Sequence, residues 1–196
     1  MAFGSRGTQE GSPTRRNSIT DLARKQIAII ATDHFEEAEL VTRATSWPGG
    51  ADVKVYSVSG APIQAVEGDT EPTHKVDVDG NLGEVDVSAF DGVVVPGGTV
   101  NADHMRLDED AQRIVKEAYD AGKVLAVICH GPWLLLNAGL ADGRRVTSYP
   151  SLELDLRNAG PTWVDEEVVI DGPLITRRNP DDLPAFVDAI TKALVG

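Results

Sequence analysis

The stretch Val124-Leu-Ala-Val-Ile-Cys129-His-Gly-Pro-Trp-Leu134 decides the fold of this 196-residue chain. Its first five residues are apolar and predict a short buried strand, and the apolar residues after Pro132 predict a helix. Between them, Cys129, His130 and Gly131 form a tight turn. Such a turn, a nucleophile elbow, needs a small residue after the nucleophile because the strand and helix backbones approach closely there; Gly131 supplies it. The stretch therefore predicts an α/β fold that presents one side chain at a strand end.

Short apolar runs alternate with amphipathic stretches along the rest of the chain. The expected strands are 26–31, 52–58, 92–95 and 123–128, and the expected helices are about 36–46 and 108–121. Because helices between strands connect parallel neighbours, this order predicts βαβ units with a mainly parallel sheet, in a three-layer α/β/α sandwich. The last third predicts a hairpin of strands 168–170 and 174–176 and a closing helix over 181–194, with Pro184 in its first turn.

The composition is that of a globular protein, with 41% hydrophobic and 25% charged residues. No stretch approaches the ~20 apolar residues of a membrane span, so we expect a cytoplasmic protein. The net charge of −13 excludes a nucleic-acid surface, which needs clustered Lys and Arg. Residues 1–24, rich in Gly, Ser, Thr and Arg, predict a flexible tail. Residues 25–196 then form a single domain.

The sequence contains one cysteine, Cys129, so no intramolecular disulfide is possible and a reducing compartment is expected. The four histidines are scattered, which argues against a structural metal site. A lone cysteine can be an inert buried residue. The Cys-His-Gly turn favours a reactive thiol instead, because the amides and dipole of the next helix point toward the sulfur and should lower its pKa.

Two further segments carry groups that suit this chemistry. In Val94-Val-Pro-Gly97-Gly98-Thr99, two glycines follow a buried strand and leave backbone N–H groups uncrowded. They predict either a plain turn or an oxyanion donor that acts with the N–H of His130. In His34-Phe-Glu-Glu-Ala-Glu39-Leu40, three glutamates lie where a helix begins, which the helix dipole alone explains. One of them can instead turn inward toward the thiol, with a raised pKa.

Together these segments resemble the PfpI-like intracellular protease and deglycase family, a branch of the ThiJ/PfpI superfamily that is related to class I glutamine amidotransferases. The resemblance covers about residues 26–194 and implies a flavodoxin-like fold. No histidine follows His130, so the late His-x-Glu of the glutaminase triad is absent. The matching stretches are Phe35–Leu40, Val94–Gly98, Ala126–Pro132, Thr147–Pro150, Trp163–Val169 and Asn179–Leu183.

The resemblance assigns a role to each site residue. It implies that Cys129 is the nucleophile, that His130 is its base or polarising partner, and that Glu39 hydrogen-bonds to the cysteine. The oxyanion and substrate are expected at Gly97, Gly98 and Gly131. Family members form dimers or larger rings in which a glutamate of the adjacent subunit orients the histidine. This chain departs from that pattern, and Asp103 is the local candidate.

The implied activity is that of a cysteine-dependent stress-response hydrolase without cofactor or metal. Its substrates would be reactive carbonyls or their early adducts on protein or nucleotide, as in a deglycase or a cofactor-independent glyoxalase. An intracellular peptidase is the second enzymatic option, ranked lower because the side chains of successive residues such as Cys129 and His130 rarely point at each other. The alternative is a non-enzymatic redox sensor or chaperone in which Cys129 oxidises beside Glu39.

Overall fold

The computed structural model describes residues 22–44, 47 and 49–196. The tail predicted for residues 1–24 therefore falls almost entirely outside the described residues. Leu22, near its end, is buried, and its N–H donates to the carbonyl of Gly49 at 2.8 Å. In the part of the chain that the structure describes, no helix combines the length and the apolar character needed to cross a bilayer.

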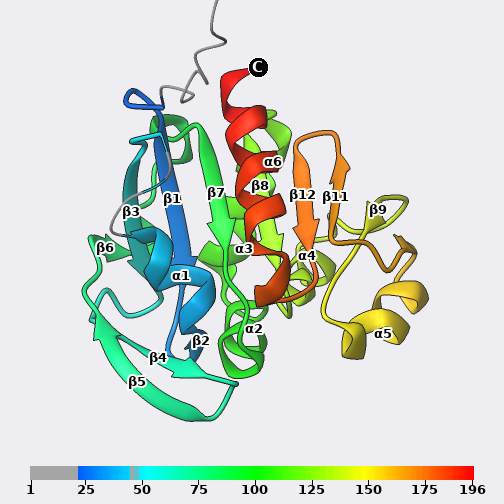
Figure 1. Ribbon diagram of the computed structural model, residues 1–196, viewed down its shortest axis with the longest axis horizontal. Helices are drawn as coiled ribbons and strands as arrows, with labels where there is room; N and C mark the ends of the chain where they lie inside the picture. Colours follow the sequence, from blue (N-terminus) through cyan, green and yellow to red (C-terminus); the bar gives the residue numbers. More distant parts are fainter. Residues whose placement is uncertain (1–21, 45–46, 48) are drawn as a thin grey trace, which may run out of the picture.

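A seven-stranded sheet forms the centre of the molecule (Figure 1). All of its neighbouring strands are parallel except the pair at one edge, β11 and β12, which form the predicted hairpin. The mainly parallel sheet is thus confirmed. In order across the sheet the strands are β11 (Val168–Asp171), β12 (Leu174–Arg177), β8 (Val124–Ile128), β7 (Gly92–Val95), β1 (Gln26–Ala31), β3 (Asp52–Ser57) and β6 (Gly80–Asn81).

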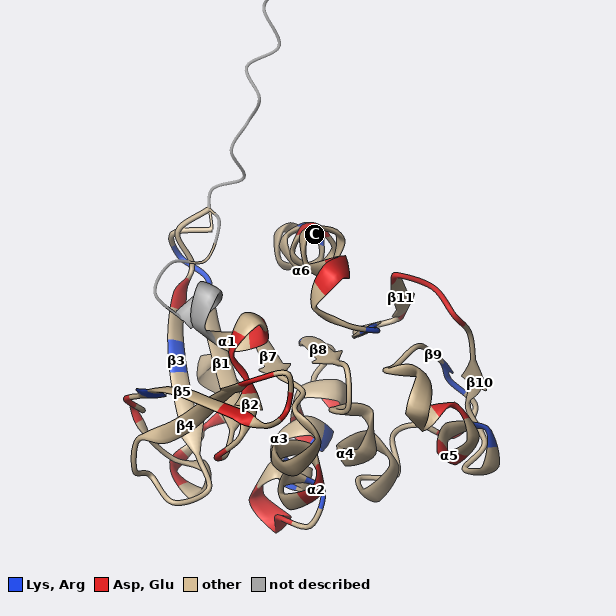
Figure 2. Ribbon diagram, turned by 60° about the horizontal axis from the view of Figure 1, so that its bottom comes forward, with Lys and Arg blue, Asp and Glu red and all other residues tan. Residues whose placement is uncertain are grey.

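Helices cover both faces of this sheet, which gives the predicted three layers (Figure 2). On one face, α1 (Glu37–Ala44) and α6 (Leu183–Val195) contribute to one apolar core. On the other face, α2 (Thr99–Met105), α3 (Glu109–Asp120) and α4 (Pro132–Asn137) contribute to the second. All five residues of β8 are buried. A strand that is covered on both sides carries no polar alternation, which is why its sequence is a continuous apolar run.

The elements missed by the sequence analysis are mostly short or lie outside the central sheet. A small sheet consists of β2 (Phe35–Glu36), β4 (Ile63–Glu67) and β5 (Glu71–Val76), and β4 and β5 form a hairpin. At the other end of the molecule lie β9 (Arg145–Val146), α5 (Glu153–Asn158) and β10 (Thr162–Trp163). Single 3₁₀ turns occupy Leu82–Glu84, Val87–Ala89, Pro150–Leu152 and Pro180–Asp182.

Two predicted helix boundaries shift for local reasons. The helix expected from residue 36 begins at Glu37, because Glu36 pairs with Val66 as part of β2. The closing helix begins at Leu183 after a 3₁₀ turn, which leaves Pro184 in its first turn as predicted. The first of these shifts matters for the site, because it removes the Glu36 carboxylate from the helix.

Candidate active site

The predicted elbow at the end of β8 is confirmed. Cys129 has a φ of 60°, a left-handed conformation that costs energy in a residue with a side chain. Its N–H donates to the carbonyl of Arg177 on β12 and its carbonyl accepts from the N–H of Tyr149, both at 2.9 Å. A Cβ on Gly131 would lie 2.8 Å from Val127 Cγ1 and 2.9 Å from the carbonyl oxygen of Ile128. Only glycine therefore lets the helix follow the strand so closely.

Cys129 is 6% exposed and lines a pocket of about 230 Å³ at the carboxyl ends of β7 and β8. The backbone N–H groups of Gly98 and His130 donate hydrogen bonds to its sulfur. These are the two amides expected to stabilise an oxyanion, and the structure brings both to the Cys129 sulfur. The pocket is lined by Glu36, Glu39, Gly68, Asp69, Gly98, Cys129, Tyr149 and Pro180.

The other two glycines of the predicted binding set use their amides elsewhere. The N–H of Gly97 donates to Glu39 Oε2 at 2.6 Å, and the N–H of Gly131 donates to the carbonyl of Ile128 at 2.8 Å. A Cβ on Gly97 would lie 2.5 Å from Cys129 Cβ and 2.7 Å from Glu39 Oε2. The structure thus gives these glycines a packing role, and their contact with a substrate stays a prediction.

Glu39 is the glutamate that turns inward, as predicted. The residue is 4% exposed, and its carboxyl group interacts with the Cys129 thiol. Burial raises the pKa of Glu39 from 4.5 to about 8, although the Gly97 N–H and the positive charge of Arg177 oppose the shift. The carboxyl group is therefore protonated at neutral pH. Oε2 accepts from the Gly97 N–H, whereas Oε1 has no hydrogen-bond partner among the described residues.

The prediction that the elbow lowers the pKa of Cys129 is wrong. Burial raises the pKa of the thiol far above its ordinary value, and the charge of Glu39, when ionised, raises it further. The amides of Gly98 and His130 act in the opposite direction but do not offset the desolvation. The following helix, α4, has six residues, so its dipole is small. The resting sulfur is consequently a thiol.

His130 lies directly against this thiol, with Nδ1 3.2 Å from Cys129 Sγ. The residue is 5% exposed and its ring stacks on Tyr149, with the centroids 4.8 Å apart. Its Nε2 faces the hydroxyls of Ser151 at 3.3 Å and Thr99 at 3.4 Å. Burial lowers the pKa of His130 while the charge of Asp69 opposes that shift, so the ring is neutral at neutral pH. The expectation that successive side chains diverge fails here, since the two residues share a strained turn.

The structure leaves one predicted residue apart from the others and adds several. Asp103 is exposed on α2, and its carboxylate pairs with none of the described residues.

Asp69, which the sequence analysis did not single out, lines the sulfur pocket from the tip of the β4–β5 hairpin. Tyr149 and Ser151 lie in or beside a stretch that carried the resemblance without an assigned role, and Thr99 closes the Gly-Gly segment. The Gly68-Asp69 pair was the one available signal for the hairpin turn.

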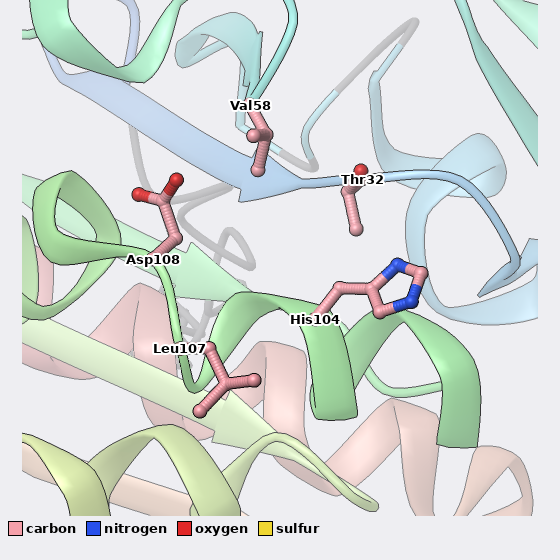
Figure 3. Close-up of a pocket in the computed structure, with 5 residues that line it drawn as sticks. All are labelled: Thr32, Val58, His104, Leu107 and Asp108. Carbon is pink, nitrogen blue, oxygen red and sulfur yellow. The ribbon is translucent and has the colours of Figure 1, made fainter.

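Among the further cavities on the described surface, two are larger than the sulfur pocket. One, of about 550 Å³, adjoins the sulfur pocket through shared Glu36 and Pro180 and is also lined by Glu37, Glu67 and His74. The other, of about 370 Å³, lies beside the ends of β1 and β3, where Thr32, Val58 and His104 point toward a common space (Figure 3). It shares no lining residue with the sulfur pocket. Within the described residues, no three His, Cys, Asp or Glu side chains gather as metal ligands would.

Comparisons with known proteins agree with this geometry. The model of the DJ-1/PfpI family matches residues 25–193. A deglycase of Pyrococcus abyssi is 39% identical over 170 residues, which is 86% of this chain and 99% of the relative. Protein/nucleic acid deglycase 2 of Escherichia coli is 34% identical over 83% of this chain and 93% of its own. The crystal structure of Drosophila melanogaster DJ-1beta superimposes with a TM-score of 0.78, at 30% identity over 88% of this chain and 91% of that chain.

Proposed function

This chain belongs to the DJ-1/PfpI family, and from that premise we propose that it is a cysteine-dependent hydrolase of the deglycase or glyoxalase type. Its substrates would be 2-oxoaldehydes such as methylglyoxal and the early adducts that these form on amines. The observation that carries the proposal is the position of Cys129 Sγ. The sulfur lies between a neutral histidine, a protonated glutamic acid and two converging amides.

The proposed reaction uses the groups that surround the sulfur. As the sulfur attacks the aldehyde-level carbon, its proton moves to His130 Nδ1 and a C–S bond forms. Glu39 donates a proton to the oxygen or the departing amine, and the amides of Gly98 and His130 stabilise developing negative charge. Glu39, now ionised, then carries the proton of this carbon to the neighbouring ketone carbon, while the hydroxyl proton passes to the ketone oxygen, which leaves a thioester. Water hydrolyses the thioester to lactate, releases the Cys129 thiol, and any amine has already departed.

The protonated thiol favours an enzyme over a peroxide sensor. Peroxide oxidises the thiolate, so a redox-sensing cysteine is usually exposed with a low pKa. Cys129 has a raised pKa and little exposure. A nearby base that removes its proton during the attack on a carbonyl is what this environment supports. The size of the pocket, about 230 Å³, suits a three-carbon carbonyl compound better than the extended backbone of a peptide substrate.

We further propose that the enzyme acts in the cytoplasm as an oligomer. A lone cysteine is typical of a reducing compartment. The exposed apolar side chains of Val100 and Leu107 lie near Asp103 on and just after α2, which is the kind of surface that a second copy could cover. In such a contact Asp103 would face the partner instead of its own His130.

The charge around the site predicts which adducts it prefers. Glu36 and Asp69 line the sulfur pocket, and Glu37 and Glu67 line the cavity beside it. Clustered carboxylates attract a cation and repel a phosphate. We expect the early methylglyoxal adduct of N-acetylarginine amide to be hydrolysed on the order of 10-fold more efficiently, in kcat/KM, than the adduct of GMP at low ionic strength. Released N-acetylarginine amide and lactate, measured in a buffer without amines, report the turnover.

The control for this prediction separates local from global charge. Glu67→Gln should lower the ratio of kcat/KM for the arginine adduct to kcat/KM for the GMP adduct. Glu153→Gln on α5, at the far end of the molecule (Figure 2), should leave this ratio unchanged. Added salt should lower the ratio as well. An equal kcat/KM for both adducts, or a preference for GMP, would contradict the electrostatic argument. The absence of lactate from either adduct and from methylglyoxal would contradict the proposed function.

A further inference from the structure

A chain of hydrogen bonds connects the hairpin tip to His130. Asp69 Oδ1 accepts from the backbone N–H of Thr99 at 2.7 Å, and Oδ2 accepts from the Thr99 hydroxyl at 2.9 Å. Thr99 Oγ1 in turn lies 3.4 Å from His130 Nε2. The hairpin tip is itself held by Glu36, whose two carboxylate oxygens accept from the N–H groups of Gly68 and Asp69 at 3.2 Å each. The aspartate is therefore fixed in position relative to α2 and the histidine.

The chemistry of these groups gives the chain a direction. An ionised carboxylate only accepts hydrogen bonds, so the Thr99 hydroxyl must give its one hydrogen to Asp69. What Thr99 then presents to His130 is a lone pair, which requires a hydrogen on Nε2. The Ser151 hydroxyl, 3.3 Å from the same nitrogen, can also accept from it. A neutral imidazole with its hydrogen on Nε2 has a free lone pair on Nδ1, and this atom lies 3.2 Å from Cys129 Sγ.

We propose that Asp69 is a positioning residue that acts through Thr99 to hold His130 in its Nε2–H tautomer, so that Nδ1 is the base for the Cys129 thiol. In the step that this permits, the S–H bond breaks and an Nδ1–H bond forms. The electron pair stays on sulfur, and the resulting imidazolium keeps its Nε2–H bond to Thr99. Asp69 takes no proton. The kinetic part of this inference rests on the proposed function, but the tautomer does not.

The tautomer matters because both partners are neutral at rest. With the hydrogen on Nδ1, the ring would present N–H to S–H, and no group there could take the thiol proton. Besides Asp69, the described titratable side chains near this pair include Glu39, which interacts with the sulfur, Tyr149, which stacks on the ring, and Glu36, which lines the same pocket. Glu39 is a proton donor at neutral pH and cannot replace the base. The direction of the Asp69 chain therefore decides whether the thiol can be activated.

Asp69→Asn tests the inference because it should reverse the direction of the hydrogen bonds from residue 69 through Thr99 to His130, with little change in side-chain shape. One amide oxygen must still accept from the Thr99 N–H, which turns the amide NH₂ toward Thr99 Oγ1. The Thr99 hydroxyl is then free to donate to Nε2. Nitrogen-15 NMR of the His130 ring should show the Nε2–H tautomer in the wild type and the Nδ1–H tautomer in Asp69→Asn. The rate of Cys129 alkylation by iodoacetamide, which needs no substrate, should fall about 10²-fold.

Variants of Thr99 and of other aspartates complete the test. Thr99→Val should give a mixture of the two His130 tautomers and slow the alkylation of Cys129. Thr99→Ser keeps the hydroxyl, so its tautomer and its alkylation rate should match those of the wild type. Asp108→Asn is the matched control, because Asp108 caps α3 by accepting from Ala111 N–H and does not line the sulfur pocket. If His130 keeps its Nε2–H tautomer in Asp69→Asn, the inference is overturned. It is also overturned if Asp103→Asn changes the His130 tautomer and Asp69→Asn does not. Loss of lactate formation with the tautomers as expected would count only against the proposed function.

Discussion

Cys129→Ser should lower kcat/KM for methylglyoxal and for its arginine adduct by at least about 10³-fold. A serine hydroxyl is far less acidic than a thiol, and the histidine beside it has a lowered pKa and is too weak a base to activate it. The sulfur also contributes the leaving group of the thioester, which an oxygen ester would not match. Lactate formation, compared between the two purified proteins at several protein concentrations, measures the effect.

The serine variant needs evidence that its elbow is intact. Serine has nearly the shape of cysteine and should keep the backbone bonds of residue 129 to Arg177 and Tyr149, so the thermal midpoint should change little. Because thiols and buffer amines react with methylglyoxal on their own, the variant also provides the background rate. Turnover within about 10-fold of the wild type by a correctly folded serine variant would remove Cys129 from the mechanism.

Glu39→Gln should have two opposite effects: it should lower activity and raise stability at alkaline pH. Activity should fall about 10²-fold because the amide cannot supply the proton that the Glu39 carboxyl group carries at neutral pH. In the wild type the same proton is lost as the pH rises through about 8, so kcat/KM should decline above that pH. In the variant that decline should be absent. A wild-type profile without this limb would contradict the role of Glu39 as the acid.

The sign of the stability effect follows from the raised pKa. The folded chain holds the Glu39 proton more tightly than the unfolded chain does, so this group costs no stability below pH 4.5. Stability is lost as the pH rises from there to about 8, and the loss amounts to a few kcal/mol. The glutamine side chain of the variant does not titrate. In urea unfolding, the free energy of unfolding of Glu39→Gln should therefore rise relative to that of the wild type as the pH rises from about 5 to about 9. At about pH 4 no such relative increase is expected.

Much of the fold was predictable because its central strands are buried on both faces. Runs such as Val124–Ile128 and Gly92–Val95 can only be interior strands, and the helix stretch before Gly122 has a clear apolar face. The small sheet around the β4–β5 hairpin was not predicted. β5 is almost wholly exposed, so its sequence carries no alternation to mark it. The joining of β12 to β8 depends on long-range pairing that no local pattern specifies.

The candidate site divides in the same way. Cys129, His130 and Gly98 lie on segments next to strand ends, where local sequence fixes the backbone, and they meet as predicted. Asp69 comes from an exposed hairpin tip, and only the tertiary structure brings it to Thr99. Whether the pKa of Cys129 is raised or lowered could not be predicted from the sequence either. It depends on how completely the thiol is buried and on a neighbouring carboxyl group, not on the turn itself.

The central claim is that Cys129 is a thiol at rest and is activated by its neighbours only during the reaction. The difference in ultraviolet thiolate absorbance between the wild type and Cys129→Ser, recorded against pH, tests it most directly. We expect no thiolate signal at about pH 8.5, where an unperturbed cysteine would be half ionised, because burial raises the pKa of Cys129. A thiolate signal that is already complete below about pH 7 would contradict the account.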